Sequence, residues 1–204
     1  MAAERWSEEA GRFARLAMTV CMALLAGAPA SRAADAPPLE ERVAACAGCH
    51  GEKGISSMPE APSLAGQPVL YTQMQLFLFR EGQRVNEIMS PMAQGLTDEE
   101  LTALAEWYAT QPPPVVTKPP DPALEAKGRA LAATHRCGIC HLSDYSGRDQ
   151  IPRIAALSEL YLLKALRDYK IGARSGDGAQ MAEVVVPLGE DDLRALAHHV
   201  AHFK

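Results

Sequence analysis

The sequence predicts an all-α protein built from two tandem copies of one helical domain. Three observations support this prediction: an internal repeat, apolar residues at helical spacing between capping signals, and the lack of a long alternating strand pattern. The one β-like run, at residues 184–186, is short. The chain has 204 residues, which is enough for one or two domains of roughly 100–150 residues each.

A motif that occurs twice anchors the repeat. The sequence Cys-x-x-Cys-His is found at residues 46–50 and again at residues 137–141, an offset of 91. Further along each copy the offset drifts to 90 and then to 92, as small loop insertions in a duplicated domain would produce. Six prolines in residues 111–122 cannot continue a helix, so this stretch predicts a semi-rigid extended linker. We therefore expect one domain at 35–111, a linker at 112–122 and a second domain at 123–204.

The helices are predicted from their caps. In the second copy Asp121 is the expected N-cap, Pro122 takes the first helical position, and the helix leads to the motif. In the first copy the residues from Thr97 to Glu100 form a capping box that begins the last helix. Two further helices are predicted, one from near Pro68 to near Gly82 and one from near Ser158 to near Gly172. The last helix of the second copy is predicted from Glu190 to about Phe203.

The N-terminus predicts a cleaved signal peptide over residues 1–33. Three arginines precede a short apolar stretch, and small residues follow it. The apolar stretch has thirteen residues, fewer than the ~20 that span a bilayer, which disfavours the alternative of an uncleaved membrane anchor. Cleavage is expected after Ala30 or after Ala33. Export removes Cys21 and leaves four cysteines in a periplasmic protein.

Three readings compete for these four cysteines: two disulfides, a four-cysteine zinc site, and covalent attachment of haem c. The pairs lie 91 residues apart, whereas a zinc site of this type has a spacing of about 15–20 residues. A histidine follows both pairs directly, and only haem attachment explains it. Residues three apart share a helix face, so two thiols can bond one porphyrin while the next histidine reaches the iron. The predicted cofactors are thus two covalently bound haem c groups, attached at Cys46, Cys49 and His50 and at Cys137, Cys140 and His141.

The repeat also predicts the second axial ligand of each iron. The second copy contains a single methionine, Met181, seven residues before Leu188. Seven residues before the matched Leu96 lies Met89, so Met89 and Met181 form a pair and Met92 does not. Thioether sulfur is a soft ligand that raises the potential of a cytochrome. The predicted iron ligands are therefore His50, Met89, His141 and Met181.

Charge narrows the range of partners. The net charge of the whole chain is −5, so it lacks the Lys and Arg excess that binding to nucleic acid requires. Residues 35–111 hold eleven Asp and Glu against four Lys and Arg, whereas residues 112–204 hold eleven against twelve. This asymmetry predicts that the two halves meet partners of different charge. An aromatic content of only 5% also suggests that a large flat cofactor fills the core.

These motifs resemble the two-domain dihaem cytochromes c of the c-four type, in which each half has the class I cytochrome c fold. The resemblance covers residues 39–203 and includes Pro62-Ser63-Leu64-Ala65-Gly66-Gln67, Tyr71, Arg80-Glu81-Gly82-Gln83-Arg84 and Met89. It implies that the carbonyl groups of Pro62 and Pro152 accept hydrogen bonds from His50 and His141. Residues 155–157 lack the Gly-Gln of the first copy. Arg84 and Arg174 are candidates for pairing with haem propionates, or are solvated surface residues.

The resemblance implies an electron carrier rather than an enzyme. We expect a periplasmic cytochrome that passes single electrons between a respiratory donor and a terminal acceptor, both of them redox proteins. Any membrane association is expected to be loose and to depend on these partners. The alternative is the haem-bearing electron-transfer subunit of a periplasmic dehydrogenase, for example one that oxidises sulfur compounds. An enzyme or gas sensor needs an open iron site, and a methionine at both matched positions argues against one.

Overall fold

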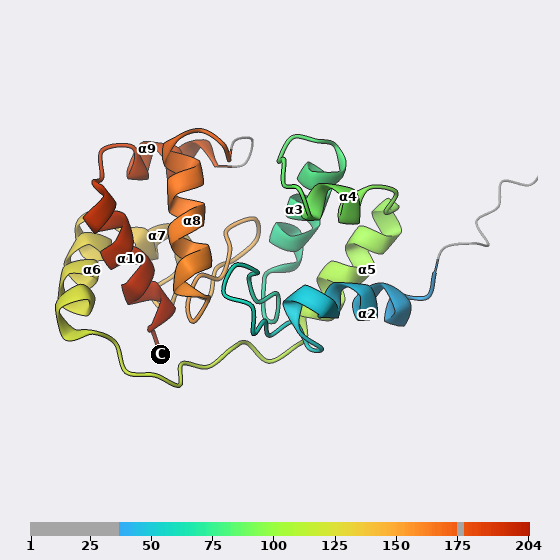
Figure 1. Ribbon diagram of the computed structural model, residues 1–204, viewed down its shortest axis with the longest axis horizontal. Coiled ribbons are helices and arrows are strands. Elements are labelled where there is room, and N and C mark those ends of the chain that lie inside the picture. Colours follow the sequence, from blue (N-terminus) through green and yellow to red (C-terminus); the bar gives the residue numbers. More distant parts are fainter. Residues whose placement is uncertain (1–36, 175–177) are drawn as a thin grey trace, which may run out of the picture. The chain divides into compact units, whose positions relative to one another are not determined.

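The computed structural model describes residues 37–174 and 178–204, which are helical apart from loops and one isolated bridge between Arg148 and Ile151 (Figure 1). The predicted signal peptide lies outside these residues. The first half contains α2 (Leu39–His50), α3 (Val69–Arg80), α4 (Met89–Ala93) and α5 (Asp98–Ala109). The second half contains α6 (Pro122–Thr134), α7 (Cys137–His141), α8 (Glu159–Lys170), α9 (Ala179–Val185) and α10 (Glu190–Ala201). None of the described helices has the length and apolar character needed to cross a membrane.

The predicted caps are present. The Thr97 side chain accepts a hydrogen bond from the Glu100 N–H, and the Glu100 side chain accepts one from the Thr97 N–H, which begins α5. Asp121 caps α6 by accepting from the N–H groups of Ala123 and Leu124. These local bonds satisfy N–H groups that a helix leaves free at its start. Residues 112–120 carry no helix or strand, and Figure 1 shows them as the extended segment between α5 and α6.

Each half has its own apolar core. In the first half α5 contacts α2 and α3, and in the second half α10 contacts α6 and α8. The first core is built from residues between 39 and 108, and the second from residues between 131 and 203. The last helix of each half therefore packs against two of the long helices of that half.

The structure adds detail about two single elements. The β-like residues 184–186 are helical or cap a helix, because α9 runs to Val185 and Val186 is its C-cap. Val185 is almost fully buried in the second core, so tertiary packing determines its conformation. The helix that leads to the second motif is broken: α6 ends at Thr134, Arg136 takes a left-handed conformation, and α7 then carries the motif. In the first half the motif closes the uninterrupted α2.

Candidate functional site

Both Cys-x-x-Cys-His motifs end in a buried histidine whose orientation is fixed by a backbone carbonyl. Nδ1 of His50 donates to the Pro62 carbonyl at 2.7 Å, and Nδ1 of His141 donates to the Pro152 carbonyl at 2.9 Å. These are the two bonds that the resemblance implied. With the proton on Nδ1, the Nε2 lone pair of each ring is available to a metal. Burial lowers the pKa of both histidines, which favours this neutral form.

The four cysteines of the two motifs are free thiols in the described part of the chain. Cys46 and Cys137, the first cysteine of each motif, are partly buried against the core of their half. Burial raises the pKa of both thiols. Each motif therefore offers two unpaired sulfurs and one fixed imidazole on a single helical segment.

Backbone hydrogen bonds support the alignment that pairs the methionines. The Leu96 N–H donates to the Ala93 carbonyl at 3.2 Å, and the matched Leu188 N–H donates to the Val185 carbonyl at 3.1 Å. Met89 and Met181 precede these turns at the same distance and are partly buried against their respective cores. Met92 is 46% exposed. The two matched methionines are thus partly buried against a core, whereas Met92 is exposed at the surface.

Comparison with known proteins identifies the family. The family model for cytochrome c matches residues 41–111. Cytochrome c4 of Thiocapsa roseopersicina is 34% identical, over 76% of this chain and 85% of that protein. This chain belongs to the cytochrome c4 family. It is accordingly a dihaem electron-transfer cytochrome with two tandem class I cytochrome c folds, and it works as an electron carrier and not as an enzyme.

Two further relatives extend the picture. The crystal structure of reduced recombinant cytochrome c4 from Pseudomonas stutzeri superposes with a TM-score of 0.75 at 28% identity, covering 81% of this chain and 97% of that one. A thiosulfate dehydrogenase electron acceptor from Thiomonas intermedia is 35% identical over 91% of this chain and 89% of that protein. Both matches extend over the two halves, whereas the family model matches the first half alone.

The residues present fit the haem c that membership of the cytochrome c4 family implies. The motifs supply free thiols, and the imidazoles beside them are neutral, buried and fixed in orientation. A further sign is Arg174, which is only 5% exposed and whose Nε lacks a hydrogen-bond partner. A buried guanidinium with an unpaired donor is costly unless an anionic group lies against it, and haem carries two carboxylates. The sequence made Arg174 a candidate for pairing with haem propionates. It could not predict that this side chain is buried, because its burial depends on contacts with the first half.

Sequence reasoning missed a tyrosine beside the first cysteine of each motif. The Tyr108 hydroxyl on α5 lies against the Cys46 thiol, and burial raises the pKa of Tyr108. In the second half Tyr145 lies near Cys137, and burial raises the pKa of Tyr145 as well. The two tyrosines do not match in the repeat, because Tyr108 aligns with Val200 and Tyr145 aligns with Gly54. An alignment of the copies therefore gives no signal for their shared position.

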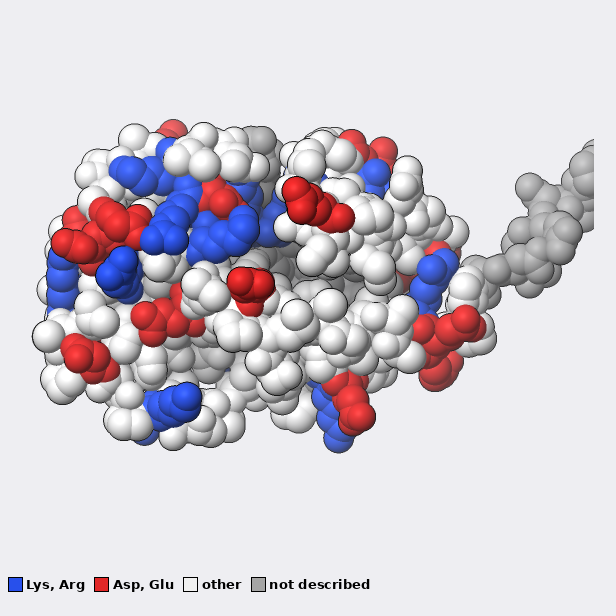
Figure 2. Space-filling model, in the orientation of Figure 1, with Lys and Arg blue, Asp and Glu red and all other residues white. Residues whose placement is uncertain are grey.

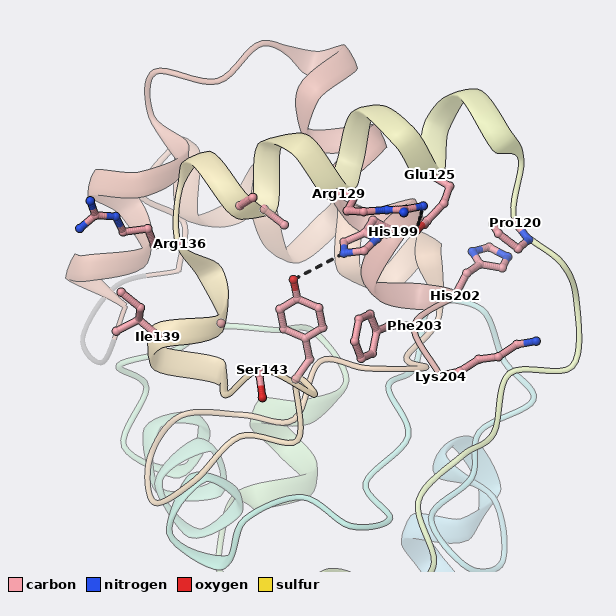
Figure 3. Close-up of a pocket in the computed structure, with 14 residues that line it drawn as sticks. Pro120, Glu125, Arg129, Arg136, Ile139, Ser143, His199, His202, Phe203 and Lys204 are labelled. Carbon is pink, nitrogen blue, oxygen red and sulfur yellow. Dashed lines mark hydrogen bonds and ion pairs between the residues drawn. The ribbon is translucent and has the colours of Figure 1, made fainter.

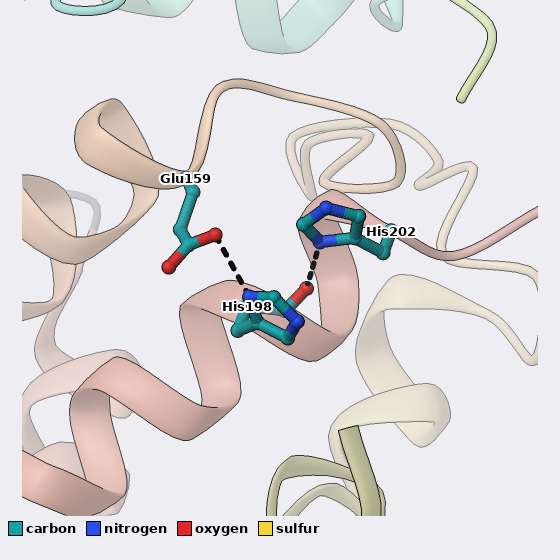
Figure 4. A group of neighbouring side chains, drawn as sticks. All are labelled: Glu159, His198 and His202. Atoms are coloured by element: carbon teal, nitrogen blue, oxygen red, sulfur yellow. Dashed lines mark hydrogen bonds and ion pairs between the residues drawn. The ribbon is translucent and has the colours of Figure 1, made fainter. Parts of the chain in front are cut away.

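A cluster of Glu159, His198 and His202 has the composition of a metal site, with candidate ligand atoms within 4.8 Å of one another (Figure 4). His198 already uses both ring nitrogens: Nε2 accepts from the Asp121 N–H, and Nδ1 donates to Glu159, each at 2.9 Å. A metal on Nδ1 would move the proton to Nε2 and break the bond to Asp121. The cluster instead joins the end of the linker to α8 and α10. His198 and His202 act as packing residues in this arrangement.

A hollow of about 830 Å³ in the second half lies beside α7 and is separate from the proposed iron ligands (Figure 3). Its lining includes Tyr145, His199 and Phe203 from the core and Arg129 and Arg136 at its rim, but neither His141 nor Met181. His199 donates from Nδ1 to Glu125 at 3.0 Å, and its Nε2 faces the Tyr145 hydroxyl at 3.5 Å. The polar groups at its base are therefore satisfied within the protein.

Proposed function

We propose that this cytochrome carries single electrons between a respiratory donor and a terminal acceptor in the periplasm. In this proposal His50 and Met89 ligate one iron, and His141 and Met181 ligate the other. The exported chain consists of domains at 35–111 and 123–204 joined by the linker at 112–122, after removal of a signal peptide at 1–33. The observation that carries the proposal is the pair of buried histidines, each fixed through Nδ1 and each preceded by two free thiols.

The chain's own groups define what the iron sites do. When bound, haem supplies one-electron chemistry at the iron. The carbonyls of Pro62 and Pro152 hold each imidazole in one orientation and increase the basicity of Nε2. Met89 and Met181 would each hold an iron through a soft sulfur atom, which favours the reduced state, and would leave no iron position for a substrate. Both sites are then suited to electron transfer and unsuited to ligand binding.

The haem assignment is tested by measuring how many haems are bound to each chain. A pyridine haemochrome assay combined with denaturing mass spectrometry should give two haems that stay bound to the chain. The oxidised protein should show low-spin spectra and a methionine-to-iron charge-transfer band. One haem per chain, or haem released by acid extraction, would overturn the assignment.

The methionine assignment is tested by a matched pair of variants. Met89→Ala should open one haem to exogenous ligands such as imidazole and lower its potential, because a soft ligand is lost. Met92→Ala is the control, since this side chain is exposed and three residues away. Loss of the charge-transfer band in Met92→Ala would show that the repeat alignment is displaced by three residues.

A second candidate function has one specific observation in its favour. The Thiomonas intermedia relative is named as the electron acceptor of thiosulfate dehydrogenase. This chain would then be the electron-accepting subunit of a periplasmic dehydrogenase of sulfur compounds. Stable co-purification with a dehydrogenase, and reduction by that enzyme plus thiosulfate, would favour this role. Reduction by a respiratory membrane donor without a stable complex would favour the free carrier.

Charge suggests how partners are chosen. Figure 2 shows Lys and Arg side chains gathered over α8, which carries Lys164, Arg167 and Lys170. The first half instead carries a net charge of −7. Glu99 and Glu106 are exposed, whereas Glu100 is bound to Arg42 and to the cap of α5.

The steering role is tested with charge variants and salt. Glu99→Gln/Glu106→Gln should slow electron exchange with a basic partner protein, and raising the salt should slow the wild type. Glu183→Gln/Asp191→Asn, at exposed positions of the second half, is the control. Rates that do not change with salt or with either substitution would remove the steering role.

A further inference from the structure

The peptide group that fixes the orientation of His141 is itself bound by a side chain of the first half. Nδ1 of His141 donates to the Pro152 carbonyl, which belongs to the same planar peptide group as the Arg153 N–H. This N–H donates to the side-chain oxygen of Gln67 at 3.1 Å. An unbroken chain of two hydrogen bonds and one peptide group therefore joins Gln67 to His141.

Gln67 is held firmly enough to act as a fixed partner. It is only 3% exposed and lies directly before Pro68, the N-cap of α3. Its own N–H donates to the Leu64 carbonyl at 3.1 Å, and its side-chain amide uses both ends, because its nitrogen donates to the Arg153 carbonyl at 2.9 Å. Moving this side chain would leave buried polar groups unpaired, which is costly.

The second bond of Gln67 supports the next peptide group of the same loop. The Arg153 carbonyl that accepts from Gln67 shares a peptide group with the Ile154 N–H, which donates to the Tyr145 carbonyl at 2.9 Å. Tyr145 lies near Cys137, the first cysteine of the second motif. Gln67 thus holds both peptide groups that flank Arg153, and each of them leads to the haem motif of the second half.

This support runs in one direction only. The residue that matches Gln67 in the second half is Leu157, whose buried apolar side chain has no hydrogen-bonding group. The residue that matches Arg153 is Ser63, whose hydroxyl accepts from the Ser56 N–H at 3.1 Å within the first half. The histidine of the first motif is therefore oriented by its own half, whereas the histidine of the second motif is also supported by the other half.

We propose that Gln67 is a positioning residue for His141 and lowers the reduction potential of the second haem alone. A peptide group that donates through its N–H is polarised and becomes a stronger acceptor at its carbonyl. A stronger acceptor on Nδ1 makes Nε2 of the imidazole more basic, and a more basic ligand favours the ferric state. This inference rests on the haem assignment proposed above, with His141 as an iron ligand.

The test is a redox titration of the full-length holoprotein followed by NMR spectroscopy. The haem methyl signals are assigned to each half by nuclear Overhauser contacts with residues of that half, so that the two midpoint potentials are measured separately. Gln67→Met keeps the approximate shape of the side chain and removes both hydrogen bonds. It should increase the equilibrium constant for reduction of the second haem by about threefold, which is ~28 mV for one electron, and leave the first haem unchanged.

A matched control removes a different bond between the halves. The Ser158 hydroxyl donates to the Pro59 carbonyl, which is not part of the peptide group that binds His141. Ser158→Ala should therefore change neither midpoint. If Gln67→Met does not fold, Gln67→Leu, which places the residue of the second half at this position, decides the question through the same two midpoints.

The sign of the change separates this role from simple docking of the halves. Loosened docking would expose both haems to water, which stabilises the more highly charged ferric state and lowers both midpoints. Two lowered midpoints in the Gln67 variants would therefore overturn the proposal, and so would a second haem whose midpoint does not move. A rise of the second midpoint in Ser158→Ala as well would also overturn it, because the effect would not be specific to the bonds of Gln67.

Failure of this inference is distinguishable from failure of the proposed function. Haem content and the low-spin spectrum of the wild type test the haem assignment before any midpoint is measured. A wild type that passes both tests, together with Gln67 variants whose second midpoint stays unchanged, would remove the role of Gln67 and leave the electron carrier intact.

Discussion

The two halves share a backbone but fill it with different side chains. The Gly66 N–H donates to the Tyr108 carbonyl, and the matched Ala156 N–H donates to the Val200 carbonyl, both at 3.0 Å. The loop before these residues closes in the same way, through bonds to the carbonyl of Gly54 in one half and of Tyr145 in the other. Since the hydrogen bonds persist where the residues differ, the loop geometry around the haem motif is the property that both copies keep.

The space beside the first cysteine of each motif is filled by an aromatic side chain that comes from a different chain position in each half. In the first half Tyr108 fills it from α5, and a Cβ at Gly54 would lie 2.7 Å from the Tyr108 ring. In the second half Tyr145 fills it from the loop, and the smaller Val200 takes the place of Tyr108. An aromatic ring against the motif has therefore been supplied from two different chain positions.

The largest expected effect follows from the separate cores. Cys46→Ala/Cys49→Ala should leave a protein with one haem, because the first motif loses both attachment points and the second motif is unchanged. Mass spectrometry under denaturing conditions should show the loss of one haem. Cys137→Ala/Cys140→Ala is the matched variant in the other half. Loss of both haems from either variant would mean that the halves do not mature independently.

The second-largest expected effect concerns Tyr108, whose ring occupies the space that Tyr145 fills in the second half. Tyr108→Val alone should lower the free energy of unfolding by about 3 kcal/mol, because it leaves a cavity in the first core. Gly54→Tyr alone should also destabilise, because the new side chain meets the Tyr108 ring. The double variant Gly54→Tyr/Tyr108→Val copies the second half and should recover much of this loss. Denaturant unfolding in a double-mutant cycle measures the recovery, and strictly additive losses would contradict the exchange.

A third difference concerns the contact between the halves. The Gln67 side chain donates to the Arg153 carbonyl at 2.9 Å and accepts from the Arg153 N–H at 3.1 Å. Its match in the second half is Leu157, which makes no such bond. Gln67→Leu should lower the free energy of unfolding by about 1–3 kcal/mol and separate the thermal transitions of the halves.

Calorimetry shows whether Gln67 couples the two halves or stabilises only the first half. Gln73→Leu is the control, because Gln73 bonds Thr102 within the first half at 2.9 Å. It should shift one transition without splitting it. Two variants that both leave a single transition would show that Gln67 does not couple the halves.

Local features of this fold were predictable from the sequence, and features of the junction were not. The caps at Thr97 and Asp121 depend on residues within one turn, so the sequence predicts them and the structure contains them. The pairing of Met89 with Met181 remains a prediction, which the matched turns support. The bonds of Gln67 and Arg174 depend on how one half docks on the other, and no local pattern encodes this.

The smallest expected effect lies at one backbone position. Gly66 has a φ of +69° and the matched Ala156 has a φ of +59°, so the second half places an alanine in the left-handed region. That conformation costs an L-residue ~1–2 kcal/mol, whereas glycine adopts it without strain. Ala156→Gly should therefore raise the free energy of unfolding by roughly 0.5–1 kcal/mol, after the greater freedom of glycine in the unfolded chain is subtracted. Gly66→Ala should lower it by about 1–2 kcal/mol, since its Cβ would also lie 3.0 Å from Pro113. Denaturant unfolding of the two variants checks both signs. Equal signs would mean that packing around Ala156, and not the backbone geometry shared with Gly66, determines stability at this position.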